Sequence, residues 1–261
     1  MRLLLIGASA VALSGCAWMG SGYAPHHYGS HSSYQYQYGQ SQGYYAGPPK
    51  RTHLDVSIAA EEFTGGNALP VATVGGVSTL KHELDDVYNT GWRASAGIHH
   101  DVAPRTTLTL DGFYKEADSK NDRLALSTDG TDTAYGSLTD YKSYGAEIGF
   151  REYATNFRPG QLRPYVGATV GAAYVEGIDA VNVSLDQGGT TGTTLQAYDG
   201  QWVPTASAVV GIDMPVSYNG TIGLESGLRY AGKRDLEFGA FRDNGTDAYS
   251  VPLRLRGRFR F

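Results

Sequence analysis

The last twelve residues of the chain, SVPLRLRGRFRF, alternate between two kinds of side chain. From residue 253 onward, arginine occupies every second position, and leucine, glycine or phenylalanine stands between the arginines. A period of two predicts a β-strand with one apolar and one polar face. By itself, this strand fits either a soluble sandwich with its arginines in water or a membrane barrel with its arginines in the interior.

The same period recurs along most of the chain. Eight predicted strands lie near 52–62, 89–101, 105–117, 140–153, 163–177, 201–214, 219–231 and 248–261. Their connections alternate between short ones, at 101–104, 154–162 and 215–218, and long ones, at 64–88, 118–139, 178–200 and 232–247. Outer-membrane barrels alternate in this way, with short turns in the periplasm and long loops outside. We therefore expect an all-β fold, a closed antiparallel eight-stranded transmembrane β-barrel with up-and-down topology, over residues 51–261.

A ten-stranded barrel is the alternative. The first long connection contains LPVATVGGVSTL, which has apolar residues on both sides of a Gly-Gly pair. Such a pair is a common hairpin turn. If this segment formed a hairpin in the wall, the strand number would rise to ten.

One face of every predicted strand is free of charge, as the positions of Ile58, Leu110 and Ile148 illustrate. An Arg or Lys facing lipid at the middle of a bilayer would cost roughly 2–4 kcal/mol. Where the strands meet the long connections, this uncharged face carries aromatic residues. They are Trp92, Tyr114, Tyr144, Tyr174, Trp202, Tyr230 and Tyr249. Trp and Tyr favour the membrane–water interface, so these residues predict an outer aromatic girdle.

The opposite face of the strands is rich in charge. The predicted lumen network comprises Arg93, Asp111, Lys115, Glu147, Arg151, Asp213, Glu225, Arg229, Arg254, Arg256, Arg258 and Arg260. An eight-stranded barrel is just wide enough for its side chains to fill the interior, where buried charges must pair. We expect the arginines of the last strand to pair with acids such as Glu225, Asp55 and Asp213, which would plug the barrel.

The first residues predict export. Arg2 precedes an apolar stretch, so residues 1–15 are interpreted as a signal peptide. The sequence Leu-Ser-Gly-Cys at 13–16 resembles the bacterial lipobox, which implies lipidation of Cys16, the only cysteine; the alternative is an ordinary cleavage after Ala17. Residues 16–50 follow as a lipidated, disordered tether rich in Gly, Tyr, Ser and Gln.

The chain ends on Phe259 and Phe261, which resemble the C-terminal signal that the barrel assembly machinery recognises in outer-membrane proteins. Segments such as PYVGATVGAAY, VGIDMPVS and LESGLRY look like strands of the small outer-membrane β-barrel superfamily, the group of the OmpA transmembrane domain and porin-family surface antigens. This resemblance covers residue 51 to the end. It implies a Gram-negative outer membrane containing lipopolysaccharide, with the N-terminus in the periplasm and the long loops outside the cell.

The sequence favours a structural role in the envelope, with loops displayed for adhesion or other contact with host or surface ligands. One alternative is a narrow porin-like channel. Another is a hydrolase sited in an outer loop, because His82 stands near Asp85 and Asp86 and could act as a base. A solvated loop is the favoured interpretation there, so we expect no enzyme, no cofactor and no metal; the net charge of −5 argues against nucleic acid as a partner.

Overall fold

A computed structural model describes residues 51–261 except 70, 72, 75, 121–122, 186–191 and 239–240; for residues 74, 236–238 and 241–246 it describes only the backbone. The expectations for the signal peptide, Cys16 and the tether lie outside the described residues. Among the residues described, no helix is long and apolar enough to cross a membrane.

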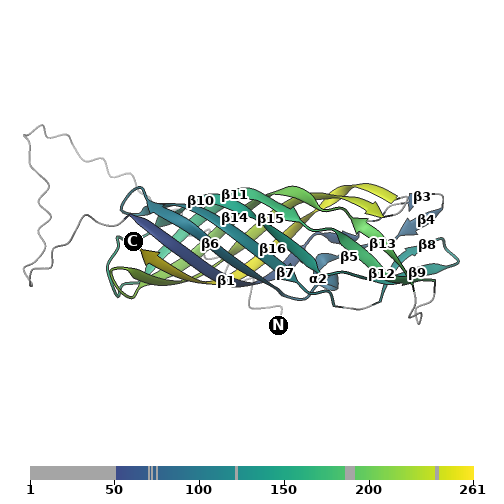
Figure 1. Ribbon diagram of the computed structural model, residues 1–261, viewed down its shortest axis with the longest axis horizontal. Helices are drawn as coiled ribbons and strands as arrows, with labels where there is room; N and C mark the ends of the chain where they lie inside the picture. Colours follow the sequence, from purple (N-terminus) through teal and green to yellow (C-terminus); the bar gives the residue numbers. More distant parts are fainter. Residues whose placement is uncertain are drawn as a thin grey trace, which may run out of the picture. The chain divides into compact units, whose positions relative to one another are not determined.

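Eight long strands form the wall of a barrel (Figure 1). They are β1 (Thr52–Gly65), β6 (Gly91–Asp101), β7 (Thr106–Ala117), β10 (Tyr141–Tyr153), β11 (Arg163–Val175), β14 (Gln201–Pro215), β15 (Gly220–Phe238) and β16 (Phe241–Arg260). Each pairs antiparallel with the wall strand before it and the wall strand after it in sequence, and β1 pairs with β16 to close the sheet. The prediction of a closed eight-stranded up-and-down barrel is confirmed.

The seam between the first and last strands is long and regular. Pairing runs from His53 opposite Arg260 to Gly65 opposite Tyr249, with one irregularity between Phe63 and Gly65. On its other side β1 pairs with β6 over ten positions, from Thr52 opposite His100 to Glu61 opposite Gly91. Every backbone edge of the first strand is therefore covered, as a span through lipid requires.

The long connections contain secondary structure that the sequence analysis treated as loop. They hold β2 (Asn67–Leu69), β3 (Thr73–Val74), β4 (Val77–Thr79), β5 (His82–Glu83), α2 (Leu84–Val87), β8 (Leu124–Thr128), β9 (Thr133–Leu138), β12 (Ile178–Ser184) and β13 (Thr193–Tyr198). We call residues 66–90, 118–140, 176–200 and 232–247 the crown. In Figure 1 the crown strands lie together at the end of the barrel away from the C-terminus.

The ten-stranded alternative is wrong, although its hairpin exists. β3 and β4 pair with each other, and the turn between them places Gly76 at φ 88°, a conformation that favours glycine. β4 then pairs with β8, and the order continues through β9, β12 and β13 to the outer part of β15. The hairpin extends the sheet in the crown, while the wall keeps eight strands.

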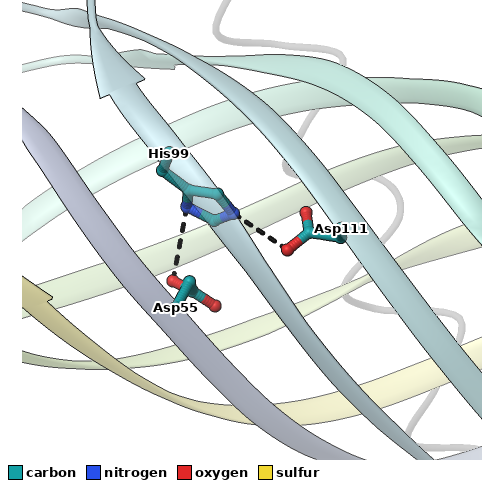
Figure 2. A group of neighbouring side chains, drawn as sticks. All are labelled: Asp55, His99 and Asp111. Carbon is teal, nitrogen blue, oxygen red and sulfur yellow. Dashed lines mark hydrogen bonds and ion pairs between the residues drawn. The ribbon is translucent and has the colours of Figure 1, made fainter.

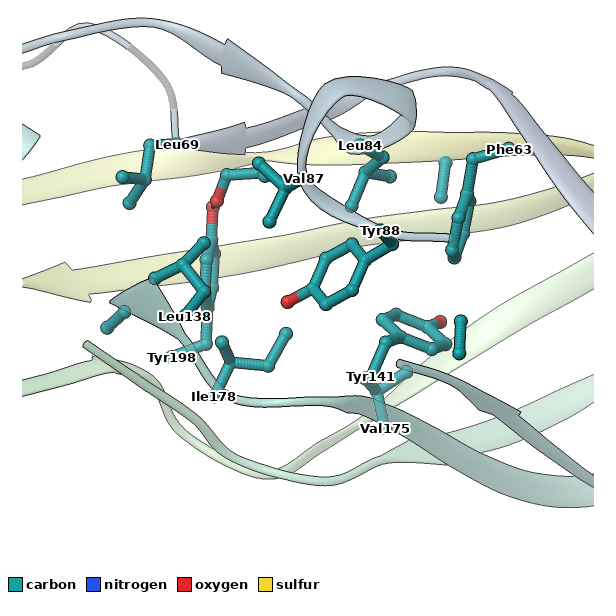
Figure 3. Packing of buried hydrophobic residues seen from close by; sticks show 14 of the residues in the cluster. Phe63, Leu69, Leu84, Val87, Tyr88, Leu138, Tyr141, Val175, Ile178 and Tyr198 are labelled. Carbon is teal, nitrogen blue, oxygen red and sulfur yellow. Dashed lines mark hydrogen bonds between the residues drawn. The ribbon is translucent and has the colours of Figure 1, made fainter. Parts of the chain in front are cut away.

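A large apolar cluster fills the crown. Phe63 and Tyr141 contribute from the wall strands, Leu84 from α2, and Ile178 and Tyr198 from the crown strands (Figure 3). All five side chains are at most 4% exposed. Burying them stabilises the crown by roughly 1.5–3 kcal/mol for a side chain the size of leucine. The crown is thus a packed structure and not a set of free loops.

Candidate functional site: the wall, the lumen and the crown

The alternating rows of the eight strands face two different surroundings. Outward-facing Ile58, Ile148 and Val170 are 58–60% exposed, whereas inward-facing Asp55 and Glu225 are 3% and 1% exposed. Strand geometry causes this division because successive side chains point to opposite faces. The wall therefore presents apolar side chains outside and ionised ones inside, the reverse of a water-soluble protein.

The predicted girdle aromatics lie on the outward face. Tyr144 stands opposite Tyr114 on one neighbouring strand and opposite Tyr174 on the other, and Tyr174 stands opposite Trp202. Ring centroids are 5.4 Å apart for Tyr144 and Tyr174, and 5.7 Å apart for Tyr174 and Trp202. Aromatic residues in register thus cross β7, β10, β11 and β14.

The other girdle residues form two further pairs. Trp92 packs against Tyr114 at 5.3 Å, and Tyr230 packs against Tyr249 at 5.4 Å. β1 contributes no aromatic, because its outward positions at this level hold Ala60 and Glu62. The girdle is interrupted at β1.

At the end nearest the C-terminus, the arginines of the last strand meet acids from the adjacent strand β1 and from β14. Arg256 makes an ion pair and hydrogen bonds with Asp55. The Nη2 atom of Arg258 lies 3.2 Å from Asp213 Oδ2 and donates to the Tyr153 hydroxyl at 2.7 Å. Tyr153 in turn donates to Asp213 at 2.7 Å. The carboxylate of Asp213 is therefore shared between a cation and a neutral hydroxyl, which satisfies its buried oxygens.

Glu225 is the centre of the next group along the axis. It accepts hydrogen bonds from Arg151 Nη2 at 3.0 Å, Arg254 Nη1 at 2.8 Å and the Tyr165 hydroxyl at 2.8 Å. Arg256 also donates to the Tyr165 hydroxyl, at 2.6 Å. Tyr165 therefore links the group around Glu225 to the Arg256–Asp55 pair nearer the C-terminus.

Glu147 and Glu61 organise the charges closest to the crown. Arg93 Nη2 donates to Glu147 at 2.8 Å, and Arg229 Nη2 lies 2.7 Å from the other carboxylate oxygen. Lys115 Nζ donates to Glu61 Oε1 at 2.7 Å. All five groups are at most 4% exposed.

Two predicted members of the lumen network have partners that the sequence analysis did not name. Asp111 accepts a hydrogen bond from His99 Nε2 at 2.9 Å (Figure 2). Arg260 lies at the rim, where its Nε donates to His53 Nδ1 at 3.3 Å and its guanidinium stacks 3.6 Å from the centre of the Phe157 ring. Arg260 therefore does not join the groups around Asp55, Asp213 and Glu225.

Asp55, His99 and Asp111 form a buried group of metal-ligating types (Figure 2). Arg151 Nη1 lies 3.1 Å from His99 Nδ1, and Arg256 binds Asp55. An arginine only donates, so His99 Nδ1 accepts and Nε2 carries the proton that binds Asp111. The two guanidinium charges oppose a divalent cation, and the arrangement is that of an ion network.

Sequence reasoning missed the tyrosines and histidines of the lumen. Tyr153, Tyr165, His53 and His99 all bind the carboxylates or arginines described above. The signal was present, since each occupies an inward position on its strand, and Tyr153 and His53 stand two residues from the predicted charges of Arg151 and Asp55. Attention to formal charge alone left these neutral donors out.

The crown connections are tied to one another by tyrosine hydroxyls. Tyr198 donates to the carbonyl of Ala68 at 2.7 Å, which joins the third long connection to the first. Tyr88 donates to the carbonyl of Thr139 at 3.2 Å, and its ring lies 6.0 Å from that of Tyr141 (Figure 3). Burial raises the pKa of the Tyr88 hydroxyl well above its usual range, so it remains a donor.

In the described residues, the side chain of His82 contacts a backbone carbonyl and not the acids of the hydrolase alternative. His82 Nε2 donates to the carbonyl of Ala125 at 2.8 Å, a contact between β5 and β8. Within the described ranges, no hydrogen bond joins His82 to Asp85 or Asp86.

The turn between β8 and β9 is held by the carboxylate of Asp129. Its Oδ1 accepts hydrogen bonds from the backbone N–H groups of Asp132 at 2.7 Å and Thr131 at 2.9 Å. These bonds lower the pKa of Asp129.

Comparison with known proteins finds no matching family model and no matching curated protein. Several solved structures are similar. Neisserial surface protein A has a TM-score of 0.43 at 14% identity, covering 80% of this chain and 97% of its own. OprG from Pseudomonas aeruginosa has a TM-score of 0.45 at 13% identity, covering 82% and 99%, and the outer-membrane protein AlkL has 0.44 at 17%, covering 85% and 97%.

OprG and AlkL are outer-membrane proteins, but at this level of similarity none of the three carries an argument about this chain. The barrel rests on the chain's own strand pairing. Its place in a membrane rests on the uncharged outward rows, the aromatic girdle and the ionised interior, which together suit a lipid surrounding. The chain is a closed, eight-stranded antiparallel β-barrel with an apolar outward face and an ionised interior.

Proposed function

We propose that this chain is a closed, non-conducting barrel with a structural and interfacial role. It anchors in the outer membrane, supports envelope integrity and displays the crown for adhesion or other surface contact. The observation that carries this proposal is that the barrel axis is filled at two successive levels. Paired ions occupy the level of the wall, and the apolar cluster occupies the crown.

The two levels oppose conduction for different physical reasons. A permeating ion would have to break pairs such as Arg151–Glu225 and Arg93–Glu147, whose side chains are at most 4% exposed. It would then have to cross apolar side chains without water, at a large desolvation cost. Leu126 and Ala180, both fully buried, belong to that second level.

The proposal includes an orientation and partners. The crown would lie outside the cell, the N-terminus in the periplasm, and the girdle among outer-membrane lipid and lipopolysaccharide. Phe259 and Phe261, 55% and 63% exposed, would be available to the barrel assembly machinery. Lipidation of Cys16 would add a second attachment. Host or surface ligands would meet the crown.

Planar-bilayer recording tests the closed barrel. The wild-type protein should give no stepwise conductance. A lumen variant, Arg151→Ala with Glu225→Ala, and a crown variant, Tyr88→Ala with Tyr198→Ala, should each remain closed, because the other level is intact. Combining all four substitutions should produce conductance, which shows that the assay detects an open path. Unitary conductance in the wild type would overturn the proposal and favour the narrow channel.

A second experiment tests display. Replacing the β8–β9 hairpin, residues 124–138, by a short Gly-Ser turn should leave the heat-modifiable electrophoretic shift of the barrel intact and reduce attachment of whole cells to surfaces. The matched control replaces only the exposed turn Asp129–Asp132. Unchanged attachment of the hairpin variant would contradict a display role for this part of the crown. If His82→Ala instead removed a hydrolytic activity of the wild type, the enzyme alternative would take its place.

A further inference from the structure

A cavity of about 10 Å³ lies where the ionised lumen meets the apolar crown. Its polar lining includes Glu61, Lys115 and Arg229, together with the hydroxyls of Ser143, Thr205 and Ser250. Its apolar lining includes Phe63 and Ala248. A volume of roughly 10–15 Å³ accommodates one water molecule.

Two charged groups of this lining have an incomplete set of hydrogen bonds. Glu61 Oε1 accepts from Lys115 and from Ser250, at 2.7 and 2.5 Å, but the buried Oε2 has no partner among the described residues. Arg229 Nη2 lies 2.7 Å from Glu147, while the buried Nη1 has no partner in the same part of the chain. Glu61 is fully buried and Arg229 is 4% exposed, so bulk solvent reaches neither group.

We propose that this cavity is a binding site for one water molecule, which donates a hydrogen bond to Glu61 and accepts one from Arg229. The unpartnered Glu61 oxygen needs a donor, and this excludes a halide as its neighbour. The unpartnered Arg229 nitrogen needs an acceptor, and this excludes a sodium or ammonium ion. A neutral molecule that does both and fits the volume is water.

The water has a structural consequence. Without it, the Lys115–Glu61 pair and the Arg93–Glu147–Arg229 group are separate units. With it, Glu61 is connected to Glu147 through Arg229, and the ion network becomes continuous up to the base of the crown core. The inference is independent of the proposed display role, because it concerns the interior of the barrel alone.

Crystallography of the wild-type protein tests the site directly. A structure beyond 2 Å resolution should show one density peak within hydrogen-bond distance of both Glu61 Oε2 and Arg229 Nη1. Crystals grown in bromide should give no anomalous signal at that peak. Absence of the peak, or a bromide signal in its place, would overturn the proposal.

A substitution that fills the cavity provides an independent test, because the direction of the stability change distinguishes a cavity that holds water from an empty one. Ala248→Val extends an apolar side chain into the cavity and displaces the water, which leaves two buried charged groups unpartnered. The folding equilibrium constant in urea should fall about tenfold or more, since each orphaned group is costly. Ala146→Val, the same substitution on the outward face of β10, is the control and should change the constant far less. A cavity without water would be stabilised by filling, and that gain would reject the proposal.

Discussion

Single strands of this protein reverse their polarity where they leave the wall and enter the crown. On β1, inward Asp55 is 3% exposed and outward Ile58 is 58% exposed; only a few residues later, inward Phe63 is 4% exposed and Glu62 faces outward. β7 repeats the change, from inward Asp111 and Lys115 to inward Ala117, which is 1% exposed. Inward side chains are thus buried on both sides of the girdle. They are charged where the outward side chains are apolar, and apolar where the outward side chains are polar.

The two interiors are therefore stabilised by different forces. The crown core gains free energy by removing apolar surface from water, and a lost contact there has a local cost. In the lumen, Glu147 and Glu225 are each shared by two or more cations, and removal of such a carboxylate leaves those cations buried without a partner. Damage to the lumen should thus spread across strands, whereas damage to the crown should remain near its origin.

The largest effect is expected from Glu225→Ala. It removes the acceptor shared by Arg151, Arg254 and Tyr165, and breaking buried pairs in this way costs about 3–5 kcal/mol. Urea unfolding, followed by the heat-modifiable electrophoretic shift, should show a lower midpoint for the whole barrel. Glu62→Ala removes an exposed carboxylate from the neighbouring level and is the control. Equal midpoints for the two variants would refute a structural lumen network.

The next largest effect is expected from placing a charge on the outward face of the wall. Leu110→Arg places a charge on the lipid-facing side of β7 and should destabilise the barrel by roughly 2–4 kcal/mol in bilayers. Glu62→Leu makes the opposite exchange at the level of the girdle and should change stability by less than about 0.5 kcal/mol. Folding titrations in lipid vesicles measure both. A similar cost for the two substitutions would mean that the girdle does not mark a boundary between lipid and water.

A smaller and more local effect is expected from Leu126→Ala. This fully buried side chain belongs to the crown core, and its truncation should cost about 2–3 kcal/mol through the cavity that it leaves. Hydrogen exchange should accelerate in β8, β9 and β12 and stay unchanged in β1 and β10. Leu185→Ala, at a side chain that is 71% exposed, is the control. Faster exchange throughout the wall would show that crown and barrel unfold as one unit.

The smallest effect is expected when the pH is lowered, and it concerns the stability of the β8–β9 turn. Backbone N–H groups of Asp132 and Thr131 lower the pKa of Asp129, so the ionised form favours the turn. Its contribution is complete above the unfolded pKa, near 3.9, and is lost as the pH falls through the lower folded value. The protection of the turn amides, measured against their intrinsic exchange rate at each pH, should therefore fall in acid in the wild type and lose this dependence in Asp129→Asn. The same dependence in the variant would assign the effect to another group.

The wall could be predicted from sequence because two requirements act on every second residue. Lipid excludes charge from positions such as Leu110 and Ile148, while the lumen accepts Asp111 and Glu147 beside them. The pattern of aromatic residues also marked where the apolar band ends. The eight strands followed from those constraints, and the structure has all eight.

The crown could not be predicted in the same way. Its hairpins at 124–138 and 178–198 are short and rich in Gly, Thr and Asp, a composition that resembles loop. Their apolar residues become meaningful only when Leu126 and Ile178 meet in a shared core, and sequence gives no register for strands so far apart. The partners of Arg260 and His99 were missed for a related reason, because lateral neighbours depend on barrel geometry.

The closing seam has a consequence for how the chain reaches this state. Asp55 binds Arg256 across 201 positions of sequence, so the contact forms only after the final segment has been made and brought back to the first. Until then both terminal strands expose a row of unsatisfied amides, which is intolerable in hydrocarbon. We therefore expect insertion into the membrane to be a single late event. A chain that lacks β16 should accumulate as a precursor bound to a chaperone.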